Sequence, residues 1–374
     1  MRKDVSLWLD LLRALASFAV FVAHIKLFGV ATPDIAGWIP ELGHDSVVLF
    51  FVLSGFVIAY TTDSRHANLK DYVTARAARL YSVAVPAILL TYTLAVIGVR
   101  HAPDGYEDSY QLGKLWLYVP FELGFFGELW MFSEPPCSNV PWWSLGYEAW
   151  YYLLFALLTF YRGTRRFVLL ALGLAFVGFK LWLLAPIWGI GALLWRNRDR
   201  VVLTPTTARV LMAASVVGYV AYKLSGLEAV LSTAGNVPFG GTEKTPLGSA
   251  QNWLHDYVVA VFAVIHLHAL GHAHLQVPTI LHRSIRYFAS FTFSLYLMHA
   301  PLLLFARNVF DYDRGNAVHV AAIACAVLVA VMVLGTLTEH RKEPYRRVFD
   351  RMLTQVGRWV RSTPIVSRVL VPNA

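Results

Sequence analysis

Long apolar runs recur from one end of this chain to the other, and each is a candidate membrane-spanning helix. Of the 374 residues, 57% are hydrophobic and 15% are charged, whereas a soluble domain is about 25% charged. We therefore expect an all-α, multi-pass membrane protein. Its predicted spans are residues 7–28, 45–62, 73–99, 142–161, 167–184, 185–196, 207–224, 254–272, 286–307 and 317–338.

The positions of the basic residues set the expected orientation, because cytoplasmic loops of membrane proteins collect Lys and Arg. Most of the 32 Lys and Arg residues fall on one side if the run at 113–133 does not cross the membrane. This distribution predicts about ten spans, a re-entrant or surface segment at 113–133, and both termini in the cytoplasm. The net charge of +9 has the same origin, so we expect no nucleic-acid partner.

Two parts of the chain are expected to differ in role. Residues 1–340 form the membrane domain, and residues 341–374 form a basic cytoplasmic tail. Within the tail, arginines flank an apolar helical face, which predicts a helix lying on the anionic inner leaflet; a solvated basic tail is the alternative. That face comprises Val348, Met352, Val356 and Trp359.

Cysteine and histidine patterns give no indication of a metal site. Cys137 and Cys325 form neither a disulfide framework nor a zinc-ligand cluster. The stretch "HLHALGHAHL" at 266–275 is rich in histidine, but no carboxylate or cysteine accompanies it. We therefore predict no bound metal.

Arg13 and His24 are the first candidate site residues. They are eleven residues apart, so they share one helix face about 16 Å apart along the axis. With the N-terminus inside, Arg13 lies in the cytoplasmic half of the span and His24 in the outer third. A snorkelling arginine and a histidine bonded to a carbonyl would be the structural explanation.

Arg76 and Arg79 are spaced i, i+3 where the third span leaves the cytoplasm. Such a pair can clamp a phosphate, since each guanidinium offers bidentate donors and a fixed charge. The positive-inside bias of loops alone would also explain them.

The stretch "VPWWSLGYEAWYY" (140–152) opens the fourth span from the outer side. Ser144 and Glu148 share a helix face, and a carboxylate at that depth indicates a paired or functional group. Trp143 and Tyr147 are candidates for stacking against sugar rings, although an interfacial aromatic belt explains them as well. His299, in the middle of "SFTFSLYLMHAP", is a further candidate for binding substrate or for a structural role.

Five of these stretches together resemble the acyltransferase family 3 membrane proteins over about residues 5–340. They are "LDLLRALASFAVFVAH", "LFFVLSGFVI" (49–58), "RAAR" (76–79), "WWSLGYEAWYY" and "FSLYLMHAPLL" (293–303). One departure occurs just before the second stretch, where Ser46 replaces the family's usual glycine and Gly43 lies further upstream. This change puts a close backbone approach at that point in doubt.

The resemblance implies ten spans in a bacterial inner membrane and acyl-CoA, by default acetyl-CoA, as a cytoplasmic donor rather than a resident cofactor. It also implies that Arg13, His24, Arg76, Arg79 and Glu148 are functional. On this reading the arginines hold the CoA phosphates, and Glu148, if it is near, orients His24 as a general base. Direct transfer and an acyl-histidine relay remain open.

The acceptor is expected to be a hydroxyl of a surface glycan or of a lipid-linked sugar, which lies outside the cytoplasm. Its identity, the acyl group and the oligomeric state stay open. A transporter or flippase for a lipid-linked saccharide is the alternative function, since it would also have many spans with buried Arg, His and Glu.

Overall fold

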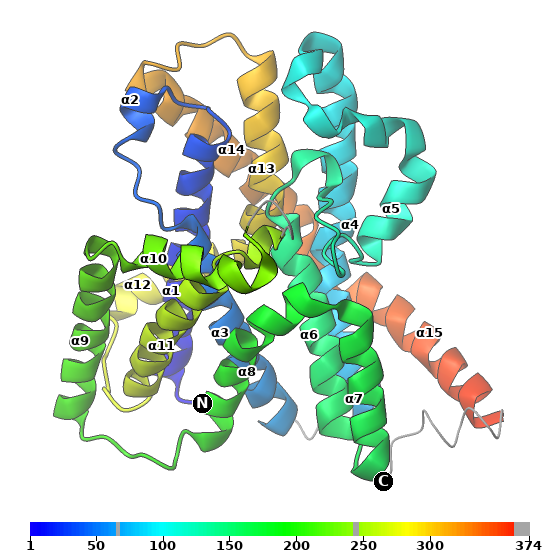
Figure 1. The fold of residues 1–374 in the computed structure, drawn as a ribbon, viewed down its shortest axis with the longest axis vertical. Helices are drawn as coiled ribbons and strands as arrows, with labels where there is room; N and C mark the ends of the chain where they lie inside the picture. The colour runs from blue at the N-terminus through cyan, green and yellow to red at the C-terminus, as the bar shows by residue number, and fades with distance from the viewer. Residues whose placement is uncertain (65–67, 242–246, 363–374) are drawn as a thin grey trace.

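The computed structural model describes residues 1–64, 68–241 and 247–362. Within these ranges the chain is helical and contains no β-strand, which confirms the all-α prediction. Figure 1 shows α9, α11 and α12 on the left and α4, α5 and α15 on the right, with α1 and α3 between them.

Each predicted span overlaps a helix of the structure. In the described part of the chain, five helices are long and apolar enough to cross a membrane, or up to seven if each of two bent helix pairs is one span. The protein is therefore a membrane protein, and the count of ten spans stays a prediction. The ten helices are α1 (Lys3–Leu27), α3 (Gly43–Ser64), α4 (Leu69–His101), α6 (Trp142–Phe160), α7 (Gly163–Val177), α8 (Phe179–Asn197), α9 (Pro205–Leu224), α11 (Trp253–Leu270), α13 (Thr292–Val309) and α14 (Ala317–Leu337).

The remaining helices are shorter or peripheral. The run at 113–133 holds only α5, whose nine residues are about 14 Å long and too short to cross a bilayer. This agrees with its expected place in a surface or re-entrant segment. The five helices of this group are α2 (Pro33–Ala36), α5 (Leu115–Leu123), α10 (Leu227–Asn236), α12 (Thr279–Ala289) and α15 (Glu343–Ser362).

Two predicted span boundaries were wrong. The break between α7 and α8 lies at Gly178, whereas the sequence placed it just before Pro186, which lies inside α8. Gly178 has φ +85°, and a Cβ there would lie 2.8 Å from the Trp130 backbone. Only glycine fits this turn, because any side chain would be strained and would clash with Trp130. The predicted span 286–307 is likewise two helices, α12 and α13, bent by 50°.

Glycines allow the central helices to approach closely. A Cβ on Gly55 of α3 would lie 2.0 Å from the Trp188 carbonyl oxygen of α8, and one on Gly191 would lie 2.0 Å from the Val52 carbonyl oxygen. At the other end of α3, a Cβ on Gly43 would lie 2.8 Å from the Ala23 Cβ of α1. The close approach that Ser46 put in doubt is therefore present, at Gly43.

Helices at the periphery expose apolar side chains rather than polar ones. Such faces cost free energy in water and fit a lipid environment. They lie on α7, α9 and α14, and include Phe167, Val168, Leu172, Phe176, Val210, Val216, Val217, Val220, Val318, Val329, Val333 and Leu337.

The tail helix α15 packs against α4. Lys70 forms an ion pair with Asp350 at 2.7 Å, and the rings of Tyr81 and Phe349 lie 5.1 Å apart between centroids. Residues 363–374 of the predicted tail lie outside the described residues. An exposed apolar face remains on α15, as the predicted membrane contact requires: Val348, Met352, Val356 and Trp359.

Candidate functional site

A cavity of about 90 Å³ lies between α1, α3, α4, α6 and α13. Apolar side chains, mostly from α3, form much of its wall. The cavity brings together five of the predicted site residues (Arg13, Arg76, Arg79, Ser144 and Glu148) and four polar residues that the sequence analysis had not singled out. The polar lining is Arg13, Ser54, Arg76, Arg79, Ser144, Glu148, Tyr152, Thr292 and Tyr296.

The three arginines of the cavity have few partners. Arg13 Nη2 donates to Thr292 Oγ1 at 3.1 Å, and the Arg76 and Arg79 guanidiniums lie about 6.0 Å from the ring centroids of Tyr152 and Phe293. Among the described residues, no carboxylate lies within 4.0 Å of any of the three. Arg76 Nε is buried without a hydrogen-bond partner there. Three positive charges thus face one cavity without an ion pair, as an anion site requires.

Glu148 is held by hydroxyl groups rather than by a histidine. Its Oε1 accepts from Ser54 Oγ at 2.6 Å and from the Tyr152 hydroxyl, while Trp188 Nε1 donates to Ser54 Oγ at 3.2 Å. The carboxylate is within electrostatic range of the cavity arginines but not in contact with them. The sequence-based idea that Glu148 orients His24 has no support from these contacts.

His24 instead pairs with His299 of α13. The two imidazole rings are nearly parallel, with 16° between their planes and 4.9 Å between their centroids, and His24 Nδ1 lies 2.6 Å from His299 Nε2. His299 is fully buried, and its Nδ1 lies 2.6 Å from the Leu295 carbonyl oxygen. Neither histidine lines the cavity; both lie further along the same faces of α1 and α13 as Arg13 and Tyr296.

With both rings neutral, these contacts assign one tautomer to each. A carbonyl oxygen only accepts, so His299 Nδ1 carries the hydrogen and Nε2 keeps its lone pair. His24 Nδ1 must then donate to that lone pair, which leaves His24 Nε2 unprotonated. In the described part of the chain no group bonds to His24 Nε2. His24 thus presents a free basic nitrogen, as a general base needs.

The other predicted substrate residues are dispersed. Ser144 lines the cavity and bonds the Tyr296 hydroxyl at 2.6 Å. Tyr147 is fully buried against Phe51 and does not reach the cavity. Trp143 stacks on His44, at the N-terminal end of α3.

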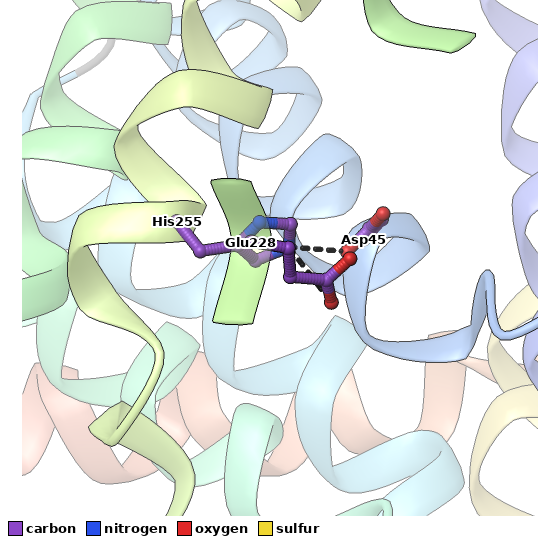
Figure 2. Close-up of side chains that lie close together, drawn as sticks. All are labelled: Asp45, Glu228 and His255. Atoms are coloured by element: carbon purple, nitrogen blue, oxygen red, sulfur yellow. Dashed lines mark hydrogen bonds and ion pairs between the residues drawn. The ribbon is translucent and has the colours of Figure 1, made fainter. Parts of the chain in front are cut away.

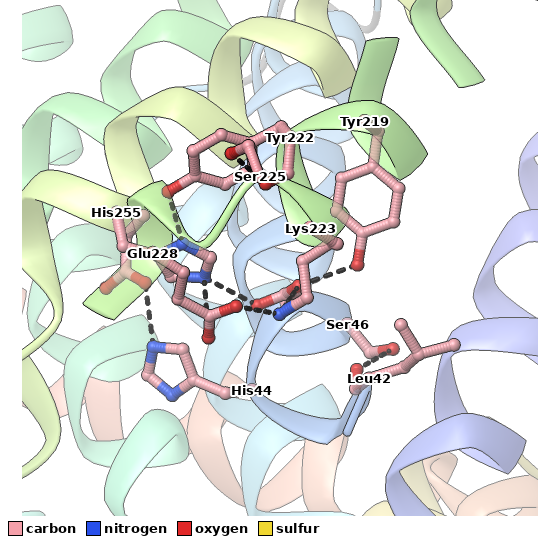
Figure 3. A network of polar contacts seen from close by, with 11 residues as sticks. Leu42, His44, Ser46, Tyr219, Tyr222, Lys223, Ser225, Glu228 and His255 are labelled. Carbon is pink, nitrogen blue, oxygen red and sulfur yellow. Dashed lines mark hydrogen bonds and ion pairs between the residues drawn. The ribbon is translucent and has the colours of Figure 1, made fainter. Parts of the chain in front are cut away.

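The sequence analysis missed a polar cluster where α3, α9, α10 and α11 meet. Asp45, Glu228 and His255 place one ligand atom each within 4.8 Å of one another (Figure 2). The Lys223 ammonium lies 3.0 Å from Asp45 Oδ2 and also contacts Glu228 (Figure 3). A lysine therefore already supplies the positive charge between the two carboxylates.

Buried charges anchor the segment 100–141. Lys180 of α8 donates to Glu128 Oε2 at 3.0 Å and to Ser133 Oγ at 2.9 Å. Close by, burial, together with the charges of Glu134 and Glu128, raises the pKa of the Glu122 carboxyl to about 9. Glu122 is therefore neutral at physiological pH, and its oxygens have no hydrogen-bond partner in the described chain.

Comparison with known proteins connects this architecture to one family. A family model described as an acyltransferase domain matches residues 6–337, which is nearly the whole chain. No curated protein and no solved structure matches the chain.

Proposed function

The chain belongs to the acyltransferase 3 family, and on that premise we propose that this membrane acyltransferase is an acyl-CoA-dependent O-acyltransferase. Its acceptor is a hydroxyl group of a surface glycan or of a lipid-linked sugar, and its acyl group is acetyl. The observation that carries the proposal is the cavity in which three unpaired arginines converge. One of them, Arg13, lies on the helix α1 that also bears His24, the partner of His299.

The donor enters from the cytoplasm. CoA is a polyanion, and Arg13, Arg76 and Arg79 provide charge-assisted donors for its phosphates without competing ion pairs. With the phosphates bound at the arginines, the pantetheine arm extends through the cavity along α1 towards His24. The negative charge of Glu148 offsets part of the repulsion among the three arginines, and its Oε1 holds the Ser54 and Tyr152 hydroxyls in the wall.

The transfer step uses His24 Nε2 as the base. It takes the proton of the acceptor hydroxyl while that oxygen attacks the thioester carbonyl carbon. The carbon–sulfur bond breaks, and the CoA sulfur leaves with its electron pair and then takes up the proton. In the alternative relay, His24 Nε2 first receives the acyl group and passes it to the hydroxyl.

The orientation that supports this chemistry places the ten helices across a bacterial inner membrane with both termini in the cytoplasm. Arg76 and Arg79 then lie at the inner end of α4, and His24 lies near the outer end of α1. Donor and acceptor thus approach from opposite sides.

Mass spectrometry of surface carbohydrate from cells with and without the protein tests the proposal. An ester that appears only with the protein supports it. A saccharide transporter would also need buried charges, but it would release no CoA thiol from acetyl-CoA. Purified protein that transfers no acyl group and binds no acetyl-CoA would favour the transporter.

A further inference from the structure

A short turn after α14 holds the N-terminal end of α13 through two consecutive side chains. This turn, η6 (Glu339–Arg341), lies between α14 and the tail helix α15. Glu339 Oε2 accepts hydrogen bonds from the backbone N–H and from the Oγ hydroxyl of Ser294, each at 2.9 Å. His340 Nε2 lies 3.1 Å from Ser290 Oγ. The turn therefore holds α13 at the bend that separates it from α12.

Glu339 supplies a cap that α13 lacks in its own sequence. The helix begins at Thr292, and its N-cap residue, Phe291, has no side chain that accepts a hydrogen bond. The first N–H groups of a helix have no partner within the helix, and the helix dipole favours a carboxylate beside them. Ser294 is fully buried, so water does not replace the Glu339 oxygen as the acceptor. Removal of this oxygen would leave a buried N–H group unpaired, which costs free energy.

The same first turn of α13 contacts two of the three cavity arginines. Thr292 Oγ1 accepts, at 3.1 Å, the one side-chain hydrogen bond that Arg13 makes within the described ranges. The guanidinium carbon of Arg79 lies 6.0 Å from the ring centroid of Phe293. Thr292 and Phe293 both line the cavity. Ser294, the residue that η6 holds, follows them directly, so a shift of Ser294 would displace both contacts.

Glu339 itself does not reach the cavity. Its carboxylate is not part of the lining, and in the described chain it forms no ion pair with the cavity arginines. Its charge is within electrostatic range of Arg13 and Arg79. A negative charge at that distance repels a phosphate bound at the arginines. The hydrogen bonds and the charge of Glu339 therefore affect a bound anion in opposite directions, which makes them separable by mutation.

We propose that Glu339 is a positioning residue of the donor site. It holds the first turn of α13, and through Thr292 and Phe293 that turn keeps two of the cavity arginines facing the donor phosphates. The proposal rests on the proposed function, because it gives Glu339 a part in binding acyl-CoA.

Two substitutions at Glu339 separate its hydrogen bonds from its charge. Glu339→Gln removes the charge, while the side-chain carbonyl oxygen still accepts from Ser294. Glu339→Ala removes both. If the hydrogen bonds position the arginines, Ala weakens acetyl-CoA binding and Gln does not. If the charge alone matters, both variants bind acetyl-CoA more tightly than the parent. Glu343→Ala, at an exposed glutamate of α15, is the matched control.

Thr292→Val tests the connection from the turn to Arg13. Valine has a similar shape to threonine but accepts no hydrogen bond, so we expect acetyl-CoA affinity to fall about tenfold. The double variant with Glu339→Ala should bind about as well as Glu339→Ala alone, because both changes break the same connection and their effects do not add.

Calorimetry of acetyl-CoA with each purified protein in detergent measures the affinity, and thermal unfolding of the same samples measures stability. We expect Glu339→Ala to raise the Kd about tenfold and Glu339→Gln to stay within about twofold of the parent. Glu343→Ala should match the parent. The rescue by Gln distinguishes positioning from a loss of stability, which would lower the melting temperature without changing the Kd of the folded protein.

Several results would overturn the proposal. Parent-like or tighter binding by Glu339→Ala would do so, as would equal losses in the Ala and Gln variants, or full additivity with Thr292→Val. If Glu339→Ala does not fold, Ser294→Ala replaces it, since this change removes one of the two hydrogen bonds. We expect it to raise the Kd about threefold, and unchanged affinity would then refute the role of Glu339. A parent that binds no acetyl-CoA would instead refute the proposed function, which is a distinct outcome.

Discussion

His24 donates its Nδ1 hydrogen to His299 Nε2 across 2.6 Å, and this contact decides which nitrogen of His24 is free to react. His299 Nδ1 donates its hydrogen to the Leu295 carbonyl oxygen, so His299 Nε2 is left to accept the hydrogen of His24 Nδ1. A neutral imidazole, rather than a carboxylate, is therefore the partner of the proposed base. Glu148, the partner expected from the sequence, lies against Ser54 and Tyr152 instead.

Replacing His24 by Gln tests the base directly. Gln keeps a hydrogen-bonding group and similar bulk but has no basic nitrogen, so we expect acyl transfer to fall about 10²–10⁴-fold while acetyl-CoA binding persists. The measurement is ester formation on surface carbohydrate at equal expression. His319→Gln, at an exposed histidine of α14, is the control. Near-normal ester from His24→Gln would return His24 to a structural role.

His299 is predicted to act as a positioning residue. In His299→Leu the His24 Nδ1 hydrogen loses its acceptor, so the ring can turn or change tautomer, and we expect kcat to fall about tenfold or more. The KM for acetyl-CoA should change little, because His299 does not line the cavity. His299→Gln can still accept from His24 and should restore part of kcat. Equal losses in Leu and Gln variants with an unstable protein would indicate a packing role alone.

Arg76 and Arg79 are predicted to bind the CoA phosphates. Changing both to Gln should weaken acetyl-CoA binding, since each charge-assisted contact is worth about 1.5–3 kcal/mol. Calorimetry on the purified protein in detergent measures this change. The double variant Arg346→Gln with Arg347→Gln removes two exposed charges from α15 and serves as the control for general electrostatic attraction. Unchanged affinity in the Arg76/Arg79 variant would refute the phosphate clamp.

Much of the fold follows from the sequence, because apolar runs and their flanking charges are local features. Most of the predicted spans begin and end within a few residues of a helix terminus, but the break near Pro186 and the start of the span 286–307 were wrong. A proline is visible as a helix breaker, whereas the left-handed turn at Gly178 depends on the approach of Trp130, which only the folded chain reveals. Long-range packing therefore set the boundary that local pattern missed.

The candidate site was predictable where the residues carry the family motifs. One cavity is lined by residues from separate stretches of the sequence: Arg13, Arg76, Arg79 and Glu148. The partner of His24 was not predictable, since the helix faces that meet cannot be paired from one sequence. The repeated His-Asp dipeptides at 44–45 and 255–256 were a signal in the sequence, but their crosswise pairing depends on the contact between α3 and α11.

Glu122 makes stability depend on pH. Burial raises the pKa of its carboxyl to about 9, from an ordinary value of 4.5 in the unfolded chain. Between these pH values the native protein binds a proton that the unfolded chain has released, so stability falls as pH rises through this window. Glu122→Gln removes this term and keeps the shape. We expect its advantage in thermal stability over the parent to be larger at pH 8 than at pH 5.

Thermal unfolding of detergent-solubilised protein, followed by intrinsic fluorescence at both pH values, measures this difference. Asp104→Asn, at an exposed carboxyl in the same segment 100–141, removes a charge without a buried proton and serves as the control. A Glu122→Gln variant with the same shift at pH 5 and pH 8 would contradict the assignment of a protonated Glu122.

The ten-span topology is the last prediction, and one cysteine on each side of the membrane decides it. The cytoplasmic assignment of "RGTRR" (162–166) rests on the basic residues, and Gly113 is expected outside. Gly163 has φ +58°, which disfavours a side chain, so Thr164→Cys is the better probe there. A Cβ on Gly113 meets no atom within 4 Å, so cysteine fits. With Cys137 and Cys325 replaced by Ser, a membrane-impermeant maleimide should label Gly113→Cys in intact spheroplasts and Thr164→Cys only after permeabilisation. Labelling of Thr164→Cys in intact spheroplasts would mean that 113–133 crosses the membrane or that α6 does not, and the ten-span arrangement would then be wrong.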